Sequence, residues 1–150
     1  MPSLTWNDDL VLEQPEMDRT HVEFVELLAA AEDALAGPRD ALMARFDALH
    51  AHTVEHFDQE DRWMAANGFA AENCHASQHA QVLALMREVD RHARELDDLE
   101  PMRVLLPELA KWFVQHAQMM DAALAWTMKE RGYDPARGGF ADPATAAALA

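Results

Sequence analysis

The sequence predicts an all-α protein: an antiparallel, up-down-up-down four-helix bundle with an N-terminal arm over residues 1–132, followed by a C-terminal extension. Half of the 150 residues are hydrophobic, enough to form the core of one domain. Only 5 Gly and 7 Pro interrupt the chain, and the abundance of Ala, Leu and Met favours helices. Apolar residues recur at helical spacing in four long segments, and short connections between such segments make antiparallel neighbours.

The first elements are an arm and a helix. Residues 1–16 are expected to form an irregular arm, and Asp18 is a good N-cap for a helix that runs to about residue 36. This helix ends before Gly37 and Pro38, and it carries one apolar face. The arm has three apolar anchors, which are Trp6, Leu10 and Leu12.

The second and third helices have clear boundary signals. Pro38 can occupy the first turn of the second helix, and Gly68 can end it because glycine takes the left-handed conformation without strain. Asn73 is a suitable N-cap for the third helix, which should fade in the acidic segment 95–100.

Two prolines complicate the fourth helix. A proline inside a helix costs ~3 kcal/mol, so we expect Pro107 in the first turn, with residues 102–105 as a short lead-in. Gly132 should end this helix. The tail, residues 133–150, could form a short final helix that starts at Asp142.

Charge and composition exclude several classes of partner. The net charge of −15 repels nucleic acid and anionic lipid. Cys74 is the only cysteine, so an internal disulfide framework and a thiolate zinc site are ruled out; we expect its side chain to be buried or half-buried. Neither a signal peptide nor an apolar run of membrane-spanning length is visible. We therefore expect a cytoplasmic monomer without membrane insertion.

Histidines and carboxylates occur in pairs at helical spacing. His56 and Glu60 are four residues apart in the second helix, and His75 and His79 are four apart in the third. Each pair therefore lies on one helix face, one turn apart. Either pair alone occurs often by chance, and a single histidine on an apolar face is more often a core residue than a ligand.

The first and fourth helices add His21, His116 and Asp121. His116 and Asp121 are five apart, so their side chains would diverge by about 140° on a regular helix. Both reach one site only if that site is wide, as a two-metal centre is. Five imidazoles and two carboxylates suit borderline divalent ions, and burying them without a metal would be costly. With a bridging hydroxide, they would fill all but one position around two octahedral ions.

From about Trp6 to Met128 the sequence resembles the hemerythrin family. The resemblance depends on four motifs, which are Met17-Asp-Arg-Thr-His21, His56-Phe-Asp-Gln-Glu60 followed by Met64, His75-Ala-Ser-Gln-His79, and Trp112-Phe-Val-Gln-His116 followed by Asp121. It implies two non-haem iron ions joined by carboxylates and an oxo or hydroxo group.

The resemblance also implies a role for each ligand. His75, His79 and His116 would fill one iron, whereas His21 and His56 would hold the other and leave a position open for dioxygen. The two carboxylates, Glu60 and Asp121, would bridge both irons.

The walls of the oxygen pocket would be apolar. The residues expected there are Phe24, Phe57, Trp112 and Met119, which could equally be plain core residues. Two features depart from the family or remain open. Ala117 follows His116 where many relatives have a bulkier residue, and His52 could be a spare histidine, a partner of His56 or an alternative ligand.

The predicted function is reversible dioxygen binding for storage, delivery or sensing, and not catalysis. The alternative is a di-iron enzyme that reduces peroxide, nitric oxide or oxygen. The histidine-rich ligand set favours the first, because ferritin-like di-iron proteins use more carboxylates. A signalling module and a purely structural zinc or manganese site are further alternatives.

Overall fold

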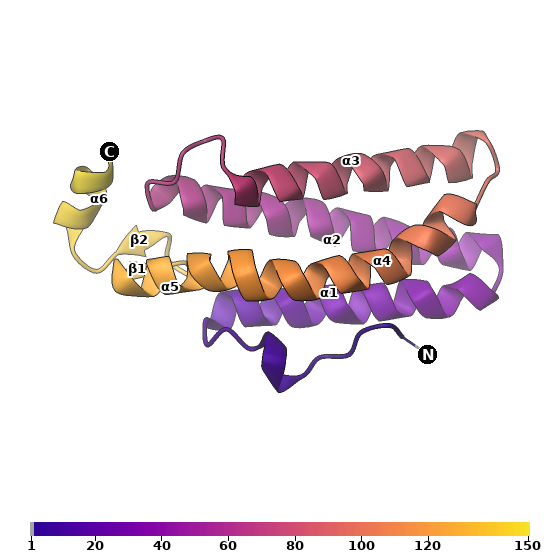
Figure 1. The fold of residues 1–150 in the computed structure, drawn as a ribbon, viewed down its shortest axis with the longest axis horizontal. Coiled ribbons are helices and arrows are strands. Elements are labelled where there is room, and N and C mark those ends of the chain that lie inside the picture. The colour runs from indigo at the N-terminus through magenta and orange to yellow at the C-terminus, as the bar shows by residue number, and fades with distance from the viewer. Residues whose placement is uncertain (1) are drawn as a thin grey trace.

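Helices make up most of the chain, and the predicted all-α class is confirmed (Figure 1). The computed structural model describes residues 2–150, so Met1, the first residue of the expected arm, lies outside them. The elements are α1 (Pro15–Asp33), α2 (Arg39–Ala66), α3 (Cys74–Glu95), α4 (Glu100–His116), α5 (Ala122–Glu130), β1 (Tyr133–Asp134), β2 (Gly139–Phe140) and α6 (Pro143–Leu149). A π-helical turn, Ala117–Asp121, joins α4 directly to α5.

The long helices lie side by side in Figure 1, and each contacts two others. Helix α1 packs on α2 and α4, and α3 packs on the same two helices. The N-terminal arm runs along the bundle and buries Leu10, while β1, β2 and α6 lie at one end of the bundle. Within residues 2–150, no helix is both long and apolar enough to cross a membrane.

Helix α1 begins earlier than predicted. It starts at Pro15, and Gln14 is the N-cap, since its side-chain oxygen accepts a hydrogen bond from the amide of Met17 at 2.9 Å. Asp18, the predicted cap, instead accepts from the amide of Leu12 at 2.8 Å. Asp18 therefore holds the arm against the helix, a role that local spacing does not reveal.

Other boundary residues behave as predicted. Gly68 ends α2 with a φ of +80°, and the Asn73 side chain caps α3 by accepting from the amide of Ala76 at 2.9 Å. Asp142 caps α6 in the same manner. Cys74 differs from expectation: it is exposed in the first turn of α3.

The predicted start of the fourth helix is wrong. Helix α4 begins at Glu100 with Pro101 in its first turn, and Pro107 lies inside it. The helical lead-in buries Met102 and Leu106 completely. Burial of each such side chain is worth about 1.5–3 kcal/mol, which together offsets the ~3 kcal/mol that an internal proline costs.

The core consists of two apolar clusters separated along the bundle. The larger contains Phe24, Phe46, Phe57 and Phe113, and the smaller is formed by Met17, Trp63, Met64, Leu124, Ala125 and Met128. On α1, Met17 belongs to the smaller cluster and Phe24 to the larger; on α2, Phe57 belongs to the larger and Trp63 to the smaller. Between the two clusters lies a layer of buried polar side chains, among them His21 on α1 and Glu60 on α2, which is the candidate site.

Candidate metal centre

All seven predicted ligands are buried in the layer between the two apolar clusters, and the structure brings them together. They are His21, His56, Glu60, His75, His79, His116 and Asp121. Their ligand atoms form two groups, each within 4.8 Å. The five-residue half contains Glu60, His75, His79, His116 and Asp121, and the four-residue half contains His21, His56, Glu60 and Asp121. Only the two carboxylates belong to both halves.

Glu60 on α2 directs one oxygen to each half. Its Oε1 is 3.2 Å from Nε2 of both His75 and His79. Its Oε2 is 2.8 Å from Nε2 of His56 and 3.4 Å from Nε2 of His21. A carboxylate with its oxygens divided in this way can bridge two cations.

Asp121 divides its oxygens in the same manner. Oδ1 is 2.8 Å from Nε2 of His75 and 3.1 Å from Nε2 of His116, whereas Oδ2 is 3.1 Å from Nε2 of His21. Both oxygens are buried, and neither makes a hydrogen bond of normal geometry with the described residues. Two buried carboxylate oxygens without a well-formed hydrogen bond are costly unless a positive charge lies beside them, as a coordinated cation would.

The π turn places Asp121 beside His116. Within it the amide of Ala122 bonds the carbonyl of Ala117, five residues back. One extra residue in the turn rotates Asp121 toward the face that His116 occupies, so the divergence expected for a regular helix does not arise. Such turns are frequent at functional sites.

Two histidines of the five-residue half direct their Nε2 atoms toward one another, as two ligands of one cation would. Their Nε2 atoms, on His79 and His116, are 3.2 Å apart. His79 Nδ1–H donates to Asp61 at 2.8 Å, and His116 Nδ1–H donates to Gln78 at 2.7 Å. A neutral imidazole has one N–H, so both Nε2 atoms present lone pairs to one point. The donor set therefore fits a divalent metal ion with nitrogen and oxygen ligands.

Charge within the cluster is balanced by protons when no metal is bound. Burial alone would lower the pKa of His21, but Asp121 and Glu60 outweigh it and raise that pKa to about 10. The same causes raise the pKa of His75 to about 9. Burial would raise the pKa of Glu60, but the neighbouring histidines, His56 first, hold it well below its usual range. A metal ion must therefore displace protons.

Aromatic rings support the histidines of the five-residue half. Phe57 stacks on His79, with ring centroids 4.0 Å apart and planes 9° apart. Trp112 stacks on His116 at 4.3 Å and 20°. Sequence reasoning missed the hydrogen-bond partners Asp61 and Gln78, whose only signal is that each adjoins a predicted ligand.

Three of the four predicted pocket residues lie near the cluster. Phe24 and Phe57 are fully buried, and Trp112 is half-buried. The structure does not place Met119 in the predicted pocket. Met119 is 68% exposed, because the π turn that brings Asp121 inward turns Met119 outward. Ala117 is completely buried in the larger core cluster.

His52 lies outside both ligand groups, beside a surface cleft. The cleft, of about 190 Å³, opens between α1 and α2 and is lined by Glu23, His52 and His56 among others. The His52 ring is 5.8 Å from the His56 ring, and its Nε2 is 3.8 Å from a Glu23 oxygen. The cleft thus reaches the four-residue half.

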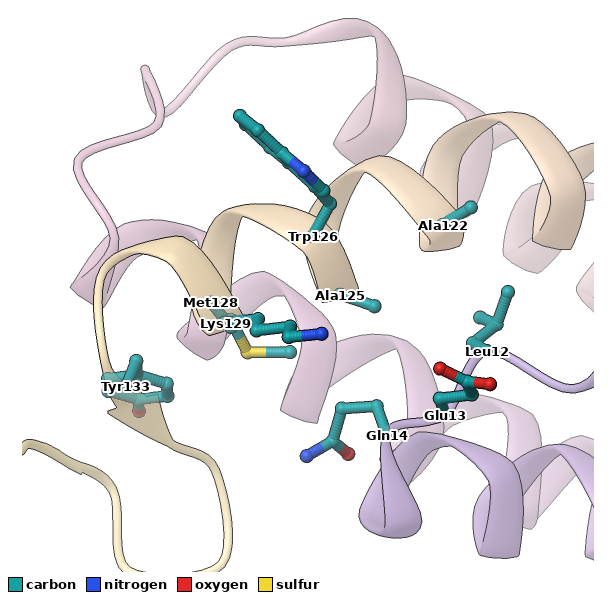
Figure 2. A pocket seen from close by; sticks show the side chains of 9 residues that line it. All are labelled: Leu12, Glu13, Gln14, Ala122, Ala125, Trp126, Met128, Lys129 and Tyr133. Atoms are coloured by element: carbon teal, nitrogen blue, oxygen red, sulfur yellow. The ribbon is translucent and has the colours of Figure 1, made fainter.

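A second cavity is separate from the polar layer. A groove of about 470 Å³ lies between the arm and α5 and is lined by Leu12, Trp126, Lys129 and Tyr133 among others (Figure 2). None of the seven clustered residues lines it, and it does not belong to the candidate centre.

Comparison with known proteins agrees with this geometry. The family model described as the Hemerythrin HHE cation binding domain matches residues 14–125. A protein named Bacteriohemerythrin, from Ralstonia nicotianae, is 38% identical over 134 residues, which cover 89% of this chain and 95% of that relative. The matched range includes every residue of the polar layer. The chain therefore belongs to the hemerythrin family.

Proposed function

We propose that this protein binds dioxygen reversibly at a pair of non-haem irons held by the seven residues, in an antiparallel up-down-up-down bundle. The observation that carries the proposal is the division of both carboxylates, Glu60 and Asp121, which direct one oxygen to each half. Family membership supports iron and dioxygen as the metal and ligand. The net charge of −15 favours a monomer, because like charges oppose self-association.

The four-residue half is the better candidate for the open position. It has two histidines, His21 and His56, where the five-residue half has three. A metal held there would have one protein donor fewer and could take a small ligand in its place, and the cleft beside His52 reaches the same half. When bound, the iron pair supplies the electrons that hold dioxygen.

The protein residues fix the metals and keep water away from them. His21 packs edge-on against Phe113, with centroids 5.1 Å apart and planes at 89°, and Phe24 packs on Phe113 at 4.7 Å. These rings are buried in the larger apolar cluster and cover one side of the polar layer. A dry pocket hinders loss of the bound ligand through hydrolysis.

The spectrum of the reduced protein after exposure to air tests this proposal. The iron-loaded protein is reduced anaerobically and mixed with air, and the visible spectrum is followed. We expect about two irons per chain and a charge-transfer band that disappears under vacuum and returns with air. Immediate conversion to a ferric form, with no such band, would contradict reversible binding. Sustained consumption of peroxide, nitric oxide or oxygen would support a di-iron enzyme instead.

A further inference from the structure

We infer that Asp61 and Gln78 are positioning residues that make the five-residue half the first to bind a divalent metal. This inference rests on the proposed iron pair and adds an order of loading to it. Neither residue is a ligand: each bonds the ring nitrogen that points away from the cluster.

The two hydrogen bonds join different helices. Asp61 on α2 accepts from His79 on α3, and Gln78 on α3 accepts from His116 on α4. Each bond fixes the proton on Nδ1 and leaves the Nε2 lone pair directed at the cluster. Partners of this kind orient the ring and raise its basicity. Folding therefore already orders these two histidines, and metal binding does not incur that loss of conformational entropy.

The histidines of the four-residue half lack such partners. Nδ1 of His21 and Nδ1 of His56 are buried without a hydrogen-bond partner among the described residues. Their rings are restrained by packing, as in the edge contact of His21 with Phe113 and the tilted contact of His56 with Phe57. No described side chain accepts a hydrogen bond from either Nδ1, so the tautomer that metal binding requires is not fixed from outside the cluster.

Ligand number acts in the same direction. The five-residue half offers three imidazoles to its metal, and the four-residue half offers two. The first metal should therefore enter the half that has both the additional donor and the oriented rings. It would then hold Glu60 and Asp121 in the position that the second metal needs.

Stepwise titration of the metal-free protein with Co²⁺ tests the order of loading. Co²⁺ binds nitrogen and oxygen ligands, and its visible absorption separates two binding steps without any need for oxygen binding. We expect a tight step followed by a weaker one. His116→Ala should remove the tight step, and His56→Ala should remove the weak one.

Substitution of the positioning residues then tests their role. Asp61→Ala and Gln78→Leu should each weaken the tight step by about 10–100-fold, the usual effect of losing an outer-shell partner. Asp61→Asn and Gln78→Glu keep an acceptor and should recover part of the affinity. The matched controls are Asp58→Ala, which is exposed on the same helix and pairs with Arg62, and Gln81→Leu, which is exposed on α3.

Three outcomes separate the possibilities. Wild-type tight affinity in both Asp61→Ala and Gln78→Leu, each with wild-type helicity, would overturn the positioning role. Equal affinity of both steps in the wild-type protein would overturn the order of loading. Failure of the wild-type protein to bind two metals would instead contradict the proposed iron pair. Asp61 is 45% exposed, and Asp61→Asn tests the role even if Asp61→Ala unfolds.

Discussion

The two halves of the centre share Glu60 and Asp121 but differ in what surrounds their histidines. In the five-residue half, His79 and His116 each have a hydrogen-bond acceptor on Nδ1 and a stacked aromatic ring. In the four-residue half, the histidines are equally buried but have no acceptor among the described residues, and a surface cleft reaches His56. One half thus has three histidines, two of them oriented by hydrogen bonds, and the other has two less restrained histidines beside a cleft.

This difference between the halves would assign two tasks to two metals. A metal with more protein donors would hold the bridging carboxylates in place, whereas a metal with fewer could exchange a small ligand. The same helical spacing supplies ligands to both halves. The number of histidines and the side chains next to them therefore distinguish the two halves, although both halves use the same types of ligand.

Loss of a shared carboxylate should have the largest effect, because it removes the element that the halves have in common. Glu60→Gln keeps the volume of the side chain, but an amide cannot bridge two cations as a carboxylate does. We expect fewer than two irons per chain, measured by chelation of the released iron after denaturation. Asp121→Asn should act in the same direction.

The matched control for this prediction is Glu55→Gln, because Glu55 is on the same helix and its side chain is 79% exposed. It should keep wild-type iron content. Full iron content in both Glu60→Gln and Asp121→Asn would refute the assignment of bridging ligands.

The sequence predicted the helical spacing of the ligands, but it did not predict which side chains hydrogen-bond to the ligand histidines. His56 and Glu60 lie on one face because the α-helix fixes that geometry over four residues. Asp61 and Gln78 contact histidines on other helices, and no local pattern encodes a pairing between helices. Only the packed bundle shows which polar neighbour of a ligand reaches a histidine elsewhere.

Tertiary packing also explains the errors at the fourth helix. Local propensity places Pro107 at a helix start, but burial of Met102 and Leu106 extends the helix past it. Tertiary contacts also explain the π turn, which local sequence does not predict. An α-helical turn would point Asp121 away from the cluster, and the contacts that favour the wider turn include those with His21 on α1 and His75 on α3.

Raising the pH should destabilise the metal-free protein more than the metal-loaded one. The pKa of His21 is raised from 6.5 to about 10 and that of His75 from 6.5 to about 9. A raised folded-state pKa stabilises the protein below the unfolded value, and this stability is lost as pH rises through the folded value. The loss should therefore fall between pH 6.5 and 10, with a slope of up to about 1.4 kcal/mol per pH unit for each histidine.

Urea denaturation at several pH values measures this loss. Metal-bound His21 and His75 no longer carry the titrating protons, so the loaded protein should show a flatter profile over the same range. Proton release on metal addition near neutral pH provides an independent check. Equal stability of the metal-free protein at pH 6.5 and pH 9.5 would show that the two histidines are not protonated in the empty cluster.

Trp112→Leu should moderately weaken metal binding, mainly in the five-residue half. The substitution removes the ring that stacks on His116 but leaves the hydrogen bond to Gln78. A specific aromatic contact is worth about 0.5–1.5 kcal/mol, so the tight Co²⁺ step should weaken by roughly 2–13-fold while the weak step changes less. Trp126→Leu, at a 65% exposed position on α5, is the control. Equal weakening of both steps would indicate general loosening of the bundle.

The smallest effect on metal binding should come from His52→Ala, at the open half. His52 belongs to neither ligand group, so both Co²⁺ affinities should stay within about twofold of wild type, as for a substitution that touches no ligand. The change enlarges the cleft next to His56. Water and small anions should then reach the four-residue half more quickly, and the oxygenated protein should convert to the ferric form faster, a rate measured by absorbance. An unchanged rate would mean that ligands enter elsewhere, and a lost metal would make His52 a ligand.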